Sequence, residues 1–175
     1  MRILAFTLVF LVLAACSTQP AKESLKIGNK VDFALLQDQY ANPFPHGQSM
    51  ELLLFTGSMS ASRDARYAMA QVNPACYEQG RLVFVANVSG MPRMVTRYLA
   101  VPKMRGYDYP VWLDYNGDAT AALPLQEDSV SVIKVSQGEI TSIDFVQGLD
   151  AILDVLRPLC GLKTQQMAGD SKASE

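Results

Sequence analysis

Apolar positions along the chain follow two periods, and the two-residue period predicts the strands. The continuous apolar runs at 52–55 and 82–88 are typical of strands buried on both faces of a sheet. Alternating apolar residues at 31–35 and a short apolar run at 111–113 predict two further strands. Apolar positions on both sides of the turn at 136–138 predict a β-hairpin.

Helical spacing marks three other segments. Apolar residues recur at helical spacing in 65–72, 94–99 and 149–156. Pro74 predicts the end of the first helix, and Pro158 predicts the end of the last. A β-α-β unit followed by a hairpin and a packing helix favours α/β layers around a mixed sheet.

The N-terminus has the pattern of an export signal. Arg2 precedes a run from 3 to 15 that is apolar apart from Thr7 and is too short to span a membrane as a helix. The run ends in Leu-Ala-Ala before Cys16, which resembles the lipobox of bacterial lipoproteins. This resemblance implies cleavage before Cys16 and attachment of acyl chains, such as palmitate, that anchor the chain to a membrane. The alternative is an ordinary secretory signal followed by a chance cysteine.

Four regions follow from this interpretation. Residues 1–15 are the predicted signal peptide, 16–24 a lipidated tether, 25–162 the folded domain and 163–175 a disordered tail. Cleavage leaves 14 basic and 17 acidic residues, a net charge of −3, so nothing indicates a nucleic-acid partner. The predicted location is the periplasmic face of the envelope. Ser17, rather than Asp, after the cysteine favours the outer membrane.

Several motifs within 28–159 suggest a family. Gly28, Phe33, Leu35 or Leu36, and Asp38 fit the pattern G-x-x-x-x-F-x-L-x-D. An apolar strand then runs into a helix, and a Tyr-Pro-Val segment at 109–111 precedes Asp114. In these features the chain resembles the thioredoxin superfamily, specifically its membrane-tethered TlpA and redoxin branch. The resemblance implies a three-layer fold, with a central mixed β-sheet and helices on both faces.

The residues that give this family its chemistry are absent. The family's Cys-x-x-Cys motif would follow the strand that ends at Phe55, where this chain has Ser60 and Arg63 at the cysteine positions. The family's cis-proline would fall near Asp128 or Ser129. Dithiol exchange requires an activated thiolate and a partner thiol. Because this chain departs from the family at both cysteine positions, we expect a redox-inactive domain without a cofactor.

A hydroxyl-rich helix start remains at this position. Ser58, Ser60, Ser62 and Arg63, with Ser129 nearby, form a candidate vestigial active-site or binding surface. One interpretation is a small anion or peptide-backbone site that uses free N–H groups, the helix dipole and Arg63. The other is that one serine caps the helix while the others are solvated.

The other two cysteines form a candidate pair. In a thioredoxin-like fold, Cys76 would follow one helix and Cys160 would end another at the same pole, away from the usual active site. In an oxidising compartment this arrangement predicts a structural disulfide that closes a loop of more than eighty residues. The alternative is an atypical thiol-redox or peroxiredoxin-like enzyme that uses Cys76 and Cys160.

Weaker candidates concern metals and partners. His46 is the single histidine, and methionines commonly fill gaps in cores, so no metal site is predicted. Arg93, Arg97, Lys103 and Arg105 surround the second predicted helix. They form either a basic patch for a partner or anionic headgroups, or a solvated face. The predicted function is that of a protein- or peptide-binding accessory module of the envelope, with an unknown envelope protein as its partner.

Overall fold

A computed structural model describes residues 23–45 and 49–163 of the chain. The predicted signal peptide, the lipidation site at Cys16, His46 and nearly all of the predicted tail lie outside these residues. Within them, no helix is both long and apolar enough to cross a membrane.

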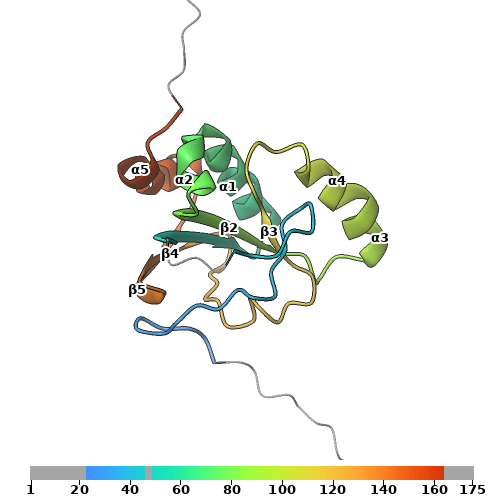
Figure 1. Cartoon of the computed structure of the whole chain (residues 1–175), viewed down its shortest axis with the longest axis horizontal. Coiled ribbons are helices and arrows are strands. Elements are labelled where there is room, and N and C mark those ends of the chain that lie inside the picture. The colour runs from blue at the N-terminus through green and yellow to red at the C-terminus, as the bar shows by residue number, and fades with distance from the viewer. Residues whose placement is uncertain (1–22, 46–48, 164–175) are drawn as a thin grey trace, which may run out of the picture.

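Five strands form one mixed sheet in the order β3-β2-β1-β4-β5 (Figure 1). They are β1 (Leu52–Thr56), β2 (Leu82–Asn87), β3 (Trp112–Asp114), β4 (Val130–Ser136) and β5 (Glu139–Val146). β1 and β3 run parallel to β2, whereas β4 is antiparallel to both β1 and β5. The predicted α/β class, the mixed sheet and the hairpin are therefore confirmed.

Burial of the central strand β1 on both faces explains its continuous apolar run. All five residues of β1 are buried, and successive side chains point to opposite faces. Leu52 and Leu54 join the core on one face of the sheet, whereas Leu53 and Phe55 join the core on the other. A strand covered on both faces cannot tolerate the polar alternation of a half-exposed strand.

Helices pack on the first of these faces. They are α1 (Met59–Gln71), α2 (Pro74–Glu78) and α5 (Leu149–Cys160), and α1 lies against α5 (Figure 1). The predicted end of the first helix is confirmed, because α1 ends at Gln71 just before Asn73 and Pro74, whereas the end of the last helix predicted at Pro158 is wrong. Pro74 starts α2, because a proline in the first turn has no N–H to leave unpaired. Pro158 lies inside α5, near its end, where the missing N–H interrupts a single exposed turn.

A continuous helical segment precedes β3. It consists of α3 (Arg93–Val95), the π-helical turn η1 (Thr96–Ala100) and α4 (Val101–Met104). Thr96 and Val101 are buried, and the N–H of Val101 donates to the carbonyl of Thr96. The π-helical spacing of five residues places these two side chains on one face. The helix is as predicted, but its apolar stripe faces outward.

The second face of the sheet is covered by irregular chain. The N-terminal segment 25–45 crosses it and contributes Phe33 and Leu36 to the core, and Leu123 enters from the connection between β3 and β4. Within the described residues the expected helical layer is therefore confined to the first face. The strand predicted at 31–35 is wrong, because this segment crosses the sheet and forms only isolated bridges on either side, at Lys30 and Gln37.

Candidate functional site

Hydroxyl groups at the start of α1 are hydrogen-bonded within the protein. Ser58 has an extended backbone and caps α1, since its Oγ accepts from the N–H of Ala61 at 3.2 Å. The Ser58 and Ser60 Oγ atoms are 3.1 Å apart, and Ser60 donates to Oδ1 of Asp128 at 2.7 Å. Ser62 is 2.6 Å from the hydroxyl of Thr56. Ser58 is thus the cap, and Ser60 and Ser62 have protein partners.

Asp128 places a carboxylate beside the start of α1 through its contact with Ser60. Its carboxylate lies at the N-terminus of α1, where the helix dipole favours negative charge. Its backbone has φ of +51°, in the left-handed region that aspartate tolerates better than most residues. Arg63 lies 3.3 Å from Asp64. The protein's own carboxylate therefore competes with any anion at this helix start.

The loop that carries Asp128 also closes over the end of β1. A Cβ atom at Gly57 would lie 2.9 Å from a Leu125 methyl group, so the loop and the strand end are in direct contact. Ser129 is buried, and its hydroxyl donates to the carbonyl of Glu127 at 3.1 Å. Gln147 donates to the Ser129 Oγ at 3.3 Å. Ser129 is therefore held inside this loop, separate from the serines of α1.

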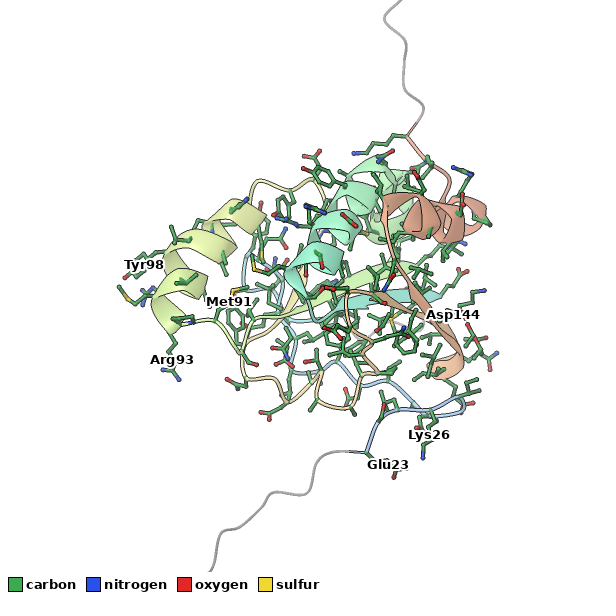
Figure 2. The ribbon with its side chains drawn as sticks, turned by 180° about the vertical axis from the view of Figure 1, so that it is seen from behind. Glu23, Lys26, Met91, Arg93, Tyr98 and Asp144 are labelled. Carbon is green, nitrogen blue, oxygen red and sulfur yellow. A yellow bond between two sulfur atoms is a disulfide. The ribbon has the colours of Figure 1, made fainter. Side chains whose placement is uncertain are left out.

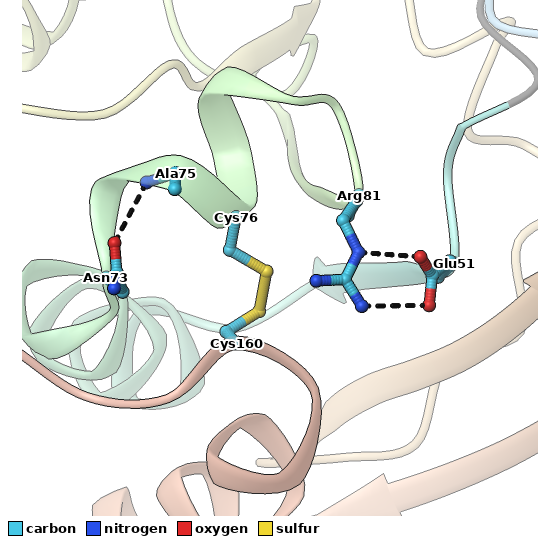
Figure 3. Close-up of a disulfide and its surroundings, with 6 residues drawn as sticks. All are labelled: Glu51, Asn73, Ala75, Cys76, Arg81 and Cys160. Atoms are coloured by element: carbon cyan, nitrogen blue, oxygen red, sulfur yellow. Dashed lines mark hydrogen bonds and ion pairs between the residues drawn. A yellow bond between two sulfur atoms is a disulfide. The ribbon is translucent and has the colours of Figure 1, made fainter.

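Cys76 and Cys160 form a disulfide that ties α2 to α5 (Figure 3). Their Cα atoms are 5.2 Å apart, and the two residues are 84 positions apart in the sequence. Cys76 is only 3% exposed. The 13 residues of α1 separate the helix start at Ser58 from this bond, a distance of about 20 Å at 1.5 Å per residue. The described sulfur pair and the family's reaction position thus lie at opposite ends of α1.

An ion pair lies beside the disulfide (Figure 3). Arg81 donates from Nε to one oxygen of Glu51 at 2.6 Å and from a terminal nitrogen to the other at 3.2 Å. This hydrogen-bonded partner lowers the pKa of Glu51 and raises the pKa of Arg81. The pair joins the residue before β1 to the residue before β2, where the two parallel strands begin.

A cavity of about 640 Å³ opens next to α2, at the end of the sheet where the parallel strands begin. Ligand pockets commonly have volumes of this size. Six aromatic residues and three acidic residues contribute to its lining. The aromatic residues are Tyr40, Phe44, Tyr77, Tyr107, Tyr109 and Trp112, and the acidic residues are Asp38, Glu78 and Asp108.

Buried contacts fix one wall of this cavity. The Gln39 side chain is 2% exposed, donates to the carbonyl of Tyr109 at 2.9 Å and accepts from the N–H of Val111 at 2.9 Å. The Gln39 side chain thereby makes the backbone hydrogen bonds that a neighbouring strand would make to the segment before β3. Arg105 donates to the carbonyl of Gln39 at 3.0 Å. This wall is therefore already ordered without a ligand.

Aromatic contacts form another part of the lining. The rings of Tyr107 and Tyr109 stack with their centroids 5.3 Å apart, and Tyr77 meets Tyr109 edge-on at 6.3 Å. Burial raises the pKa of Tyr109 far above its ordinary value, so its hydroxyl stays neutral and donates to the carbonyl of Arg66. This part of the lining offers ring faces, whereas the hydroxyl groups of Tyr107 and Tyr109 are already bonded to Arg66. The sequence analysis missed this cavity, although three aromatic residues within 107–112 were a visible signal.

Metal ligation has no basis in the described part of the chain. Within residues 23–45 and 49–163, no group of three or more His, Cys, Asp or Glu side chains could hold a metal ion. Met50 and Met69 are buried in the two cores, whereas Met59 and Met94 are exposed on separate helices. These four methionines therefore lie on different parts of the fold.

Comparison with known proteins gives the fold. No family model matches the sequence, and no curated protein matches it. The structure is similar to a putative protein disulfide isomerase from Bacteroides thetaiotaomicron, with a TM-score of 0.50 and 13% identity over 77% of this chain and 87% of that one.

Two other solved structures are also similar. One is a peroxiredoxin-like protein from Aquifex aeolicus, with a TM-score of 0.48 and 9% identity over 79% of this chain and 90% of that one. The other is the exposed lipoprotein thioredoxin of Streptococcus pneumoniae, with a TM-score of 0.44 and 17% identity over 71% of this chain and 97% of that one. The sheet order and the likeness to the putative disulfide isomerase show an α/β protein of thioredoxin-like fold. In this chain the helix start that follows the central strand carries serines, and its two described cysteines are joined to each other.

Proposed function

We propose that the protein is a redox-inactive, thioredoxin-like binding module, anchored by a lipid on Cys16 at the periplasmic face of the outer membrane. One observation carries the redox-inactive part of this proposal. The hydroxyl groups at the start of α1 bond to the protein itself, and the described sulfurs, on Cys76 and Cys160, bond to each other at the far end of that helix. No thiol is then available at the position where the fold carries out dithiol exchange.

The aromatic cavity is the proposed ligand site. The exposed ring faces of this cavity favour apolar and aromatic side chains. We therefore propose that the partner is an envelope protein that presents an apolar or aromatic side chain on an accessible peptide segment. The ordered wall around Gln39 supports this assignment, because a preformed site loses less conformational freedom on binding.

Pull-down from envelope extracts tests the binding role. The bait is the mature chain, residues 16–175 with Cys16→Ser, which retains every residue of the described fold. Tyr40→Ser removes a cavity side chain that is 56% exposed, and Tyr67→Ser is a matched control on α1 with 59% exposure. We expect a reproducible partner that is lost only in Tyr40→Ser. Absence of any partner, or equal capture by both variants, contradicts the proposal.

Tryptophan fluorescence then locates the contact. Trp112 is the single tryptophan and lines the cavity. A peptide from the captured partner that enters the cavity should shift the Trp112 emission in the wild type and in Tyr67→Ser. Binding without a change in emission would place the contact elsewhere.

The competing function is thiol redox chemistry by the cysteine pair. Insulin-reduction and peroxide assays with wild type and Cys76→Ser compare the two proposals. We expect equal, background activity in both proteins, since Cys76 is buried and disulfide-bonded. Activity in the wild type that disappears in Cys76→Ser would favour the atypical enzyme.

Palmitate labelling in a bacterial host tests the anchor. The full chain should incorporate labelled palmitate and sediment with the outer-membrane fraction, whereas Cys16→Ser should not be labelled. An unlabelled wild-type chain would refute the anchor, and label in the inner-membrane fraction would refute the outer-membrane assignment.

A further inference from the structure

The helical segment from α3 to α4 exposes apolar side chains. Met94, Tyr98 and Leu99 are 69%, 59% and 66% exposed, and Met91 and Val95 are each 38% exposed. Residues at positions 94 and 98, and at 95 and 99, are one turn apart and share the outward face. Within the described fold this face has no element packed over it, and Figure 2 shows Arg93 and Tyr98 at one margin of the molecule, away from Asp144.

The charged residues on this segment have one sign. No Asp or Glu occurs between Glu78 and Asp108 in the sequence, whereas Arg93, Arg97 and Lys103 lie on this segment. The guanidinium of Arg97 lies 5.6 Å from the ring centre of Tyr98, so a cation and an aromatic ring are presented together. The whole molecule is acidic, and this segment is a local basic exception.

The π-helical turn explains how an apolar stripe comes to face solvent. It spaces the buried anchors Thr96 and Val101 five residues apart, and Met104 continues the contact with the core. The small hydroxyl of Thr96 and the side chain of Val101 occupy the inward face. The larger apolar side chains are therefore held on the outside by a packed, ordered helix.

We infer that this docking patch, formed by Met91, Met94, Val95, Tyr98 and Leu99 with Arg93, Arg97 and Lys103, binds the surface of an anionic phospholipid membrane. Apolar side chains on one helix face with basic side chains beside them are typical of helices that lie in the interface. The apolar tips would enter the boundary between headgroups and acyl chains. The basic side chains would extend to the phosphates.

The length of the tether argues for a membrane as the occupant. This step rests on the proposed lipid at Cys16. Six residues lie between Cys16 and Glu23, the first described residue, so a fully extended tether of seven residue steps reaches about 25 Å. The domain would then stay close to the lipid surface. A basic, apolar patch held at that distance meets phosphate headgroups at high local concentration.

Vesicle co-sedimentation tests the inference without the anchor. The protein is residues 16–175 with Cys16→Ser, mixed with vesicles of phosphatidylcholine and phosphatidylglycerol at 3:1 or of phosphatidylcholine alone. We expect binding to the anionic vesicles that weakens as salt is raised. Arg93→Gln and Arg97→Gln should each lower the partition coefficient about fivefold. Leu99→Ser should lower it about tenfold.

Matched controls lie elsewhere on the surface. Leu35→Ser changes a side chain that is 73% exposed, and Lys30→Gln and Lys134→Gln remove exposed charges outside the patch. These variants should bind like the parent chain. Equal binding to neutral vesicles, or parent-like binding by the patch variants, overturns the inference. Capture of an acidic protein by the patch without vesicle binding also overturns it.

Vesicle binding by the patch and palmitate labelling of Cys16 are tested by separate experiments. A negative vesicle result leaves palmitate labelling at Cys16 to stand or fall by itself. Failure of that labelling leaves salt-dependent vesicle binding as evidence for the patch.

Discussion

Removal of the disulfide should strongly lower the free energy of unfolding of this domain. The variant is Cys76→Ala with Cys160→Ala, made in a Cys16→Ser background so that no thiol remains to form mixed disulfides. The bond links residues 84 positions apart. Closure of a loop of this length lowers the entropy of the unfolded chain by an amount worth about 4.5 kcal/mol at 25 °C.

Urea and thermal unfolding, followed by far-ultraviolet circular dichroism, measure this loss. Unfolding entropy is about 2.1 cal/mol/K per residue, so for a folded part of about 140 residues the same free energy lowers Tm by about 15 °C. The urea m-value should rise, since the unfolded chain becomes more expanded.

The wild-type domain under reductant is the control, because it keeps both sulfur atoms and loses only the bond. It should unfold close to the double variant. Loss of less than about 1 kcal/mol, or two free thiols in protein exported under oxidising conditions, would refute the assignment of a structural disulfide.

Three further changes test local contacts. Ser58→Ala should lower the free energy of unfolding by about 1 kcal/mol through loss of the α1 cap, and an unchanged urea midpoint would contradict the cap. Gln39→Leu leaves two buried backbone groups without a partner, at about 1–3 kcal/mol each, and should also change the Trp112 emission; parent-like stability would contradict that role. The pKa of Glu51, followed by NMR, should lie below 4.5 and return toward it in Arg81→Gln. Since folding lowers this pKa, the stabilisation from the pair is complete above pH 4.5 and is lost as pH falls through the folded pKa; an unshifted Glu51 would exclude the pair.

The hydrophobic pattern correctly predicted those helices and strands that depend mainly on residues close together in the sequence. β1 and β2 follow directly from their apolar runs, and α1 follows from the spacing of Ala65, Ala68 and Met69. The segment at 31–35 failed because its alternation reflects insertion of Phe33 into a core while the chain crosses the sheet. Only Phe33 of the three alternating residues is buried and Leu35 is 73% exposed, so the alternation here marked neither a strand nor a buried face.

The candidate site depended more on tertiary contacts. The serines of α1 were visible in the sequence, but Asp128, which binds Ser60, comes from a loop 68 positions away. The cavity is built from segments at 38–45, 77–83 and 107–112, none of which has a distinctive period. Sequence position alone could not bring these segments together.

The disulfide and the cavity are joined through α2, and this link bears on how the binding site is held. A helix of five residues has little stability alone, because nucleation costs more than so few hydrogen bonds return. α2 is fixed instead by Cys76, which is bonded to α5, and by the buried ring of Tyr77. Its last residue, Glu78, and the following residues Gln79 and Gly80 form part of the cavity lining. Reduction of the bond should therefore loosen the cavity wall before it unfolds the sheet, so the oxidising envelope would maintain the proposed binding site as well as the fold.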